Sequence, residues 1–194
     1  MTTWFTSDTH FGHRRILELG QGRPFETVEA HDSALASNWN SVVKPEDTVY
    51  HLGDVVLGPW EAGLGIIKGL NGYKYLVPGN HDRIFSKERP GRRENSLPAY
   101  ASAFDEILEE TFDVEFEGVK FRVSHFPSLE ILFGDRKDRF LDLRPEDDGT
   151  PIIHGHTHQD RIVTETTKGT LQVSVGVDAN NWTPVTLESI LARI

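Results

Sequence analysis

Hydrophobic and polar positions in the first half of the chain alternate between strand-like and helix-like spacing. Three short runs of apolar and β-branched residues are typical of buried strands: residues 3–8, 48–54 and 73–80. Between the first two runs, one segment (26–43) carries apolar side chains at the spacing of an amphipathic helix: Val28, Leu35, Trp39 and Val42. Pro45 ends this helix, and a second helix is expected over residues 60–70. The alternation predicts an α/β fold.

The second half of the chain predicts antiparallel hairpins. Two segments have the pattern of a hairpin with a glycine at its turn: residues 114–126, turning at Glu117-Gly118, and residues 161–175, turning at Lys168-Gly169. Helices are expected over residues 98–110 and, at the end of the chain, over residues 186–194.

Two charged stretches, residues 83–97 and 127–150, are expected to be long loops, which in compact domains are often functional. The second stretch is equally consistent with a lid over a site and with a solvated loop. The first contains basic side chains that either steer a phosphate or form a solvated surface: Arg83, Lys87, Arg89, Arg92 and Arg93.

The composition describes an acidic chain without cysteine. Its 194 residues fit a single domain over residues 1–194. A net charge of −10, from 30 acidic and 20 basic residues, disfavours broad binding to nucleic acid, although short oligonucleotides remain candidates. The chain begins without a basic and apolar leader and contains no run near the ~20 apolar residues of a membrane span, so a cytoplasmic protein without a membrane partner is expected. The absence of cysteine excludes disulfides and thiolate ligands.

Polar side chains with metal-binding chemistry follow the predicted strands. Asp8 and His10 end the first run, Asp54 ends the second, Asn80 ends the third, and His125 follows a later strand. Since ligands of open α/β sheets bind beyond the carboxyl ends of the strands, these side chains are expected to converge. Three further histidines crowd into the segment HGHTH: His154, His156 and His158. Carboxylate, amide and imidazole ligands together suit one or two divalent ions such as manganese, iron, zinc or nickel.

Five short motifs occur in a fixed order along the chain: Asp8-Thr9-His10, Gly53-Asp54, Gly79-Asn80-His81-Asp82, His125 and Gly155-His156-Thr157-His158. In this order they resemble the calcineurin-like metallophosphoesterase family, and the match spans nearly the whole chain. The segments SDTHFGH and GVDANNWTPVTL make the chain similar to the small stand-alone bacterial or phage-type phosphoesterases of that family. The resemblance implies two packed mixed β-sheets flanked by helices, in four layers (αββα), with a dinuclear metal site at one edge.

The resemblance also implies which residues hold the two ions. One ion is expected to have four ligands: Asp8, His10, Asp54 and His158. The other is expected to share the Asp54 carboxylate as a bridge and to have three further ligands: Asn80, His125 and His156. Two manganese ions are favoured, with iron, zinc or nickel as alternatives.

The expected mechanism is in-line attack on phosphorus by a metal-bridging hydroxide, with His81 protonating the leaving oxygen and Asp82 orienting His81. His13 and Arg83 are candidates for contact with the substrate phosphate. The remaining histidines are expected to have structural places: His31 on the polar side of its helix, His51 inside the second strand, and His154 in a strand facing the interior.

The favoured activity is that of a phosphodiesterase acting on a small phosphodiester such as a cyclic nucleotide. Protein phosphatases of the family usually carry Gly-Asp-x-x-Asp-Arg-Gly, whose arginine grips the phosphate, whereas residues 53–58 here read GDVVLG. A phosphomonoester, which carries more charge, would benefit most from that arginine. The alternatives are a phosphomonoesterase, a nucleotide pyrophosphatase and an oligonucleotide nuclease. A non-catalytic scaffold is disfavoured because His81 and every expected ligand are present. The natural substrate and the oligomeric state stay open.

Overall fold

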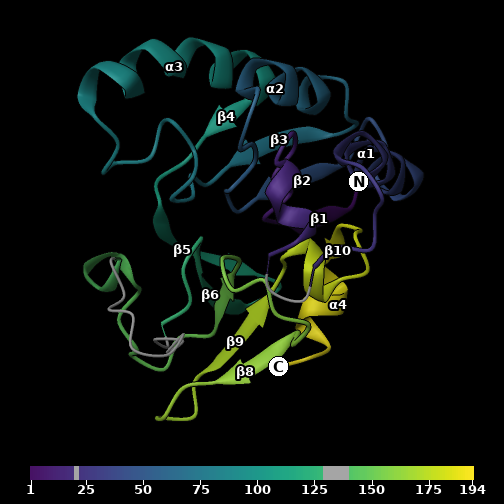
Figure 1. The fold of residues 1–194 in the computed structure, drawn as a ribbon. Coiled ribbons are helices and arrows are strands. Elements are labelled where there is room, and N and C mark those ends of the chain that lie inside the picture. The colour runs from purple at the N-terminus through teal and green to yellow at the C-terminus, as the bar shows by residue number, and fades with distance from the viewer. Residues whose placement is uncertain (20–21, 129–139) are drawn as a thin grey trace.

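Two five-stranded sheets pack against each other in the computed structural model, which describes residues 1–19, 22–128 and 140–194 (Figure 1). The first sheet contains, in spatial order, β10 (Val185–Thr186), β1 (Thr3–Thr6), β2 (Thr48–His51), β3 (Tyr73–Leu76) and β4 (Glu106–Ile107). The second contains β5 (Thr111–Phe116), β6 (Val119–Ser124), β7 (Ile152–His154), β9 (Leu171–Ser174) and β8 (Val163–Glu165).

Both sheets are mixed. β1 to β4 run parallel, and β10 pairs antiparallel with β1 at one edge. In the second sheet, β6, β7 and β9 are parallel, and β5 and β8 add an antiparallel strand at each edge. The predicted fold class, two mixed sheets flanked by helices, is confirmed.

Both predicted hairpins are present and turn at the predicted glycines. β5 and β6 pair across Glu117 and Gly118, whose φ angles of 49° and 79° lie in the left-handed region that tight hairpin turns require. β8 and β9 pair on either side of Gly169, which has a φ of 84°.

Three long helices cover the first sheet (Figure 1). The helices of the described residues are α1 (Val28–Val42), α2 (Trp60–Lys68), α3 (Pro90–Ala103) and α4 (Leu187–Leu191), and 3-10 turns occur at Arg14–Leu17, Leu141–Leu143 and Val177–Ala179. α1 begins after Thr27, whose side chain accepts the N–H of Ala30 at 3.1 Å. α4 lies beside β10 (Figure 1). Within these described ranges, no helix has both the length and the apolar character needed to cross a membrane.

The first sheet is buried on both faces because its side chains alternate between two hydrophobic clusters. Trp4 of β1 packs into the cluster shared with the helices, together with Trp39 of α1. Its neighbour Phe5 points the other way, into the cluster between the two sheets, where it joins Phe121 of β6 and Val173 of β9. Burial of each such side chain stabilises the fold by about 1.5–3 kcal/mol, so this packing fixes the position of one sheet against the other.

The region of α3 differs from the prediction. Residues 98–110 are predicted to be helical, but α3 begins eight residues earlier in the chain, at Pro90, and ends at Ala103. Pro90 occupies the first turn, where a missing N–H has no helical partner to lose, and Pro98 is accommodated inside the helix. The predicted loop 83–97 is therefore wrong over its second half. Of the predicted loop 127–150, residues 129–139 lie outside the described residues.

The buried carboxylate of Asp47 fixes the beginning of β1 against the beginning of β2. It accepts hydrogen bonds from the N–H groups of Thr2 at 2.7 Å and Lys44 at 3.0 Å, and from the indole of Trp4 at 3.1 Å. Burial opposes ionisation, but the bonds from Lys44, Thr2 and Trp4 outweigh it and hold the pKa of Asp47 below its ordinary value.

Replacing Asp47 by asparagine is expected to lower the free energy of unfolding by about 1–3 kcal/mol at pH 7, because the amide cannot accept all three bonds. The pKa is depressed in the folded state, so this stabilisation is present above the ordinary carboxyl pKa of 3.8 and is lost as the pH falls through the lower folded-state pKa. Urea denaturation from pH 7 to pH 3 measures it. The gap between Asp47→Asn and wild type should shrink below about pH 4, and a gap that widens on acidification would contradict this account.

Candidate metal centre

The seven predicted metal ligands all lie on loops that directly follow strands: Asp8 and His10 after β1, Asp54 after β2, Asn80 after β3, His125 after β6, and His156 and His158 after β7. β1, β2 and β3 are parallel, as are β6 and β7, so the loops of each sheet leave at the same edge. A bridge between Ser7 and Gly176 continues β1 alongside the segment that follows β9, which joins the two sheets at this edge.

Five of these ligands have a left-handed backbone, with φ angles of 60° at Asp8, 48° at His10, 54° at Asp54, 71° at His156 and 50° at His158. Residues with a Cβ rarely adopt this conformation, which costs about 1–3 kcal/mol each. The His10 N–H bonds the Asp54 carbonyl at 3.0 Å, which holds two of these loops together. Strain concentrated on residues with metal-binding side chains indicates a functional site.

The ligand side chains form two clusters that share one carboxylate. In the first, His10 Nε2 lies 3.2 Å from His158 Nε2 and 3.6 Å from Asp54 Oδ2, and His158 Nε2 lies 3.6 Å from Asp8 Oδ1. In the second, which contains Asp54, His125 and His156, His125 Nε2 lies 3.5 Å from Asp54 Oδ2. Asn80 joins the second cluster through its side-chain oxygen, 3.1 Å from His125 Nε2. The geometry thus groups the residues in the two predicted sets.

The two carboxylates direct free oxygen atoms into the centre. Asp8 and Asp54 are each 1% exposed, and each uses one oxygen to accept a backbone N–H, from His156 at 2.9 Å and from His81 at 2.8 Å. Asp8 Oδ1 is buried without a hydrogen-bond partner among the described residues. Such an unpaired acceptor is costly in a protein interior, and a bound cation would remove the cost. The residues present therefore fit a pair of divalent ions.

Burial favours the neutral, metal-binding form of two of the imidazoles, those of His10 and His156. Burial lowers the pKa of His10 well below its ordinary value, and the charges of His158 and Arg23 lower it further. Burial lowers the pKa of His156 to about 2. His125 Nδ1 lies 2.7 Å from the Leu52 carbonyl, which can only accept, so Nδ1 carries the proton and Nε2 presents its lone pair to the centre.

His158 is oriented by Asp178, which follows β9. Their Nδ1 and Oδ2 atoms lie 2.9 Å apart, and this leaves His158 Nε2 directed at Asp8 and His10. Burial would lower the pKa of His158, but the hydrogen bond to Asp178 and the charge of Asp8 raise it above its ordinary value. A carboxylate bonded to the far nitrogen of a histidine ligand is a common support for a metal site.

Arg23 is a buried residue that the sequence interpretation did not assign to the site. It bonds both oxygens of Asp178 at 3.0 and 2.8 Å, and it donates to the carbonyl oxygens of Asp8 at 2.7 Å and Thr9 at 3.1 Å. Its Nη1 also lies 2.8 Å from Nε2 of His31. The prediction for His31 is wrong: this side chain is 0% exposed instead of lying on the polar side of its helix. The segment GVDANNW, which contains Asp178, was the sequence feature that could have indicated this part of the site.

His81 and Asp82 follow Asn80 but differ in their surroundings. The His81 side chain is 43% exposed, and its Nε2 lies 4.0 Å from Asp54 Oδ2, at the margin of both clusters. Asp82 is buried and accepts the N–H groups of Asp54 at 2.9 Å, Val55 at 3.1 Å and Gly79 at 2.8 Å. These bonds hold the loops after β2 and β3 together. Within the described residues, Asp82 also accepts the Tyr100 hydroxyl at 3.3 Å and forms no hydrogen bond with His81.

The two candidates for substrate contact lie on different sides of the centre. His13 lines the cavity described below, with its ring 5.4 Å from that of His10, and burial lowers its pKa to about 4. Arg83 instead packs its guanidinium over Trp60 at 4.6 Å and bonds Ser96 at 3.0 Å, on the side of α2 and α3. Two other histidines lie where predicted, buried in strands: His51 in β2 and His154 in β7.

A cavity of about 970 Å³ opens over the first cluster. Its lining includes His10, His156 and His158, and His81 stands at the same cavity. A volume of this size is at the upper end of the range for small-molecule sites.

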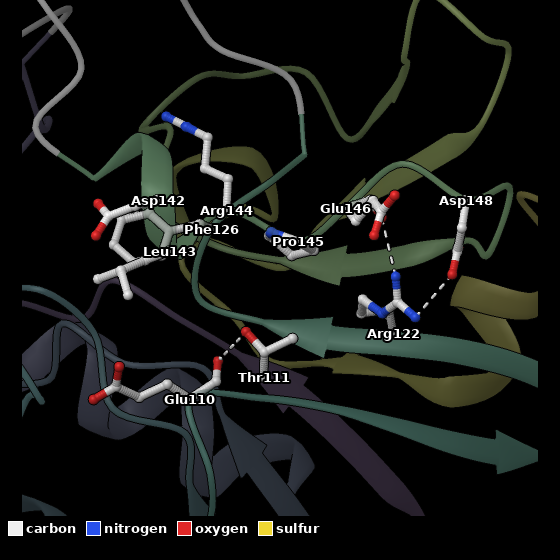
Figure 2. A pocket seen from close by; sticks show the side chains of 10 residues that line it. All are labelled: Glu110, Thr111, Arg122, Phe126, Asp142, Leu143, Arg144, Pro145, Glu146 and Asp148. Carbon is white, nitrogen blue, oxygen red and sulfur yellow. Dashed lines mark hydrogen bonds and ion pairs between the residues drawn. The ribbon is translucent and has the colours of Figure 1, made fainter.

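A second cavity, of about 520 Å³, lies beside β5 and β6 (Figure 2). Two arginines of the described residues line it. Arg122 bonds Asp113 at 2.7 Å and Asp148 at 3.1 Å, and its Nη1 donates to the Glu146 carbonyl at 3.0 Å. Arg144 donates to the Pro127 carbonyl at 2.8 Å. Four acidic side chains line this cavity: Glu110, Asp142, Glu146 and Asp148. Such a lining disfavours a phosphate group, so the first cavity is the better candidate for binding a phosphate ester.

The comparisons with known proteins agree with this centre. A family model described as the calcineurin-like phosphoesterase superfamily domain matches residues 1–191. The chain belongs to this superfamily. Gene 66 protein of Mycobacterium phage L5 is 36% identical over 188 residues, which cover 91% of this chain and 86% of the phage protein.

Two further similar proteins match this chain over nearly its whole length. An uncharacterised protein of Methanocaldococcus jannaschii is 29% identical over 198 residues, which cover 98% of this chain and 90% of the archaeal protein. The crystal structure of a protein of unknown function from Aquifex aeolicus matches 100% of this chain and 99% of its own, with 28% identity and a TM-score of 0.71. The superfamily membership assigns the centre to phosphate-ester chemistry.

Replacing Asp178 by asparagine is expected to weaken the binding of one Mn²⁺ ion by about 10–100-fold, because the amide cannot hold His158 as the carboxylate does. The second ion, whose expected ligands do not touch Asp178, should keep its affinity. Isothermal titration calorimetry of the metal-stripped protein measures both. Asp142→Asn is the matched control, since Asp142 is an exposed carboxylate paired with Lys87 at 2.6 Å. Equal weakening of both ions, or the same loss in the control, would refute the assignment.

Proposed function

We propose that the protein is a metal-dependent phosphodiesterase that hydrolyses a small phosphodiester with two divalent ions, manganese favoured. The observation that carries the proposal is the sharing of the Asp54 carboxylate by two clusters of imidazoles and carboxylates beside a cavity of about 970 Å³. One ion would have the first cluster as ligands: Asp8, His10, Asp54 and His158. The other would have the second cluster together with the amide oxygen of Asn80: Asp54, His125 and His156.

The chemistry that two divalent ions supply when bound is charge withdrawal from the phosphoryl group and a bound water with a pKa near 7. The chain supplies the geometry and the proton. Asp54 is fixed by the N–H of His81 at 2.8 Å, so the same loop that positions the shared carboxylate also positions the His81 ring. His81 is half-exposed, 4.0 Å from Asp54 Oδ2, and protonates the leaving oxygen of a substrate in the cavity.

The cations of the cavity favour a singly charged diester over a doubly charged monoester. Among the described residues, two arginines line the cavity, Arg23 and Arg161. Arg23 is buried and forms an ion pair with Asp178 at 2.8 Å, whereas Arg161 is exposed. Arg83, the nearest basic residue in sequence to the histidine of the third motif, packs on Trp60. The phosphate therefore relies on the ions for neutralisation, which suits the lower charge of a diester.

Stripping the metal with a chelator is expected to abolish hydrolysis, and adding Mn²⁺ back is expected to restore it, since the ions supply the charge withdrawal. The measurement compares bis-p-nitrophenyl phosphate with p-nitrophenyl phosphate, and the diester should be cleaved well above the monoester. A preference for the monoester would turn the proposal into a phosphomonoesterase. Hydrolysis of neither substrate by protein carrying two ions would exclude both.

The substitution His81→Ala is expected to reduce kcat on a diester with an alkyl leaving group by about 10²–10⁴-fold, because an alkoxide needs protonation as it departs. With p-nitrophenol, which leaves without a proton, the loss should be far smaller. Metal content measured by atomic absorption serves as the control and should stay at two ions, since His81 belongs to neither cluster. An equal loss on both leaving groups would rule out proton donation by His81.

A further inference from the structure

The cavity over the metal centre has an apolar side that the hydrolysis itself does not need. Besides the histidines, it is lined by Ile16, Leu19 and Trp182. Ile16 is 5% exposed, whereas Leu19 keeps 48% of its surface exposed. An isolated exposed leucine is ordinary on a protein surface, but this one lines a cavity together with an indole and next to an expected phosphate site.

Trp182 is held against the cavity by a costly backbone conformation. Its φ of 62° lies in the left-handed region, which a bulky residue adopts only when its surroundings impose it. Its N–H bonds the Val177 carbonyl at 3.0 Å, and its carbonyl accepts the Asn38 amide at 3.2 Å. Phe25 meets its ring edge-on at 5.5 Å. The indole is therefore fixed before any ligand arrives, which lowers the entropic cost of stacking on it.

The indole is also tied to the metal centre. The guanidinium of Arg23 lies over the Trp182 ring, 5.5 Å from its centroid. The same guanidinium bonds Asp178 at 2.8 Å, and Asp178 holds the ligand His158 at 2.9 Å. Since these contacts are buried or half-buried, the aromatic surface stands at a fixed offset from the cluster of Asp8, His10, Asp54 and His158. A substrate group resting on the indole would thus have its phosphate placed relative to the ions.

We infer that the apolar side of this cavity, formed by Leu19 and Trp182, is a subsite for a planar aromatic group on the non-leaving ester arm of the substrate. The inference rests on the proposed phosphodiesterase activity and narrows its substrate class. A flat group contacts the part of the indole that lines the cavity and covers Leu19, while its phosphate lies at the metal ligands. Both a nucleoside and a phenolic ester carry this chemistry.

The test uses three diesters that share p-nitrophenol as the leaving group and differ in the other arm: methyl, phenyl and thymidine 5′ esters. With wild type and Mn²⁺, kcat/KM should be on the order of 10-fold higher for the aromatic arms than for methyl, mainly through KM. Leu19→Ser should remove most of this advantage, because it lowers kcat/KM for the aromatic arms far more than for methyl. Trp182→Phe should keep it, because an aromatic ring remains. Leu97→Ser is the matched control, since Leu97 is 47% exposed on α3, outside the cavity, and it should change nothing.

The outcomes separate the subsite from the proposed activity. Equal kcat/KM for all three arms, or the same loss for every arm in Leu19→Ser, overturns the subsite while leaving the diesterase in place. An advantage for thymidine alone assigns the subsite to nucleosides, and an advantage for both aromatic arms assigns it to flat groups in general. If no diester is hydrolysed, the proposed activity fails, and calorimetric binding of the intact thymidine ester then judges the subsite. Equal affinity in wild type and Leu19→Ser overturns it; a loss in Leu19→Ser supports it.

Discussion

The position of the Asp54 carboxylate depends on a second carboxylate, Asp82, buried directly behind it. Asp82 accepts the backbone N–H groups of Asp54 and Gly79, at 2.9 and 2.8 Å, and so holds the loop after β2 against the loop after β3. Only glycine allows this approach, because a Cβ at Gly53 would collide with the backbone of Gly79. With the loops fixed, Asp54 Oδ2 stands 3.6 Å from His10 and 3.5 Å from His125. Both clusters exist because this one atom is placed between them.

A second buried network supports the centre from the opposite side. Arg23 donates to the carbonyl oxygens of Asp8 and Thr9, at 2.7 and 3.1 Å, and so stabilises a turn whose φ angles are unfavourable. Its bonds to Asp178 extend the same support to His158. The network reaches outward through His31, whose Nδ1 bonds Asp32 at 2.8 Å. The guanidinium thus joins segments far apart in sequence, and its buried charge is balanced by Asp178.

The sequence predicts which side chains converge at the centre because each motif directly follows a strand, and strand ends are readable from local pattern. Hairpin turns at Gly118 and Gly169 are local in the same sense. Arg23 and Asp178 escape prediction because they lie 155 positions apart, and neither belongs to a periodic pattern. The error over α3 has a similar origin: Pro98 looks like a helix start, although Pro90 occupies that place in the fold. In each case the local sequence does not contain the tertiary contacts, and these contacts decide which local signal prevails in the fold.

The strain in the centre bears on its chemistry. Five ligands hold left-handed backbones, at about 1–3 kcal/mol each, and Asp8 Oδ1 is buried without a hydrogen bond among the described residues. The Nε2 atoms of His10 and His158 lie 3.2 Å apart, within hydrogen-bonding distance of each other, and both belong to the first cluster. Only glycine fits at position 155, because a Cβ there would collide with the side chains of Ser7 and Asp8. A bound cation would remove the cost of the unpaired Asp8 oxygen. Holding the candidate ligands in this arrangement therefore lowers the stability of the fold. In return the centre is preorganised, so little rearrangement is needed for ions to bind.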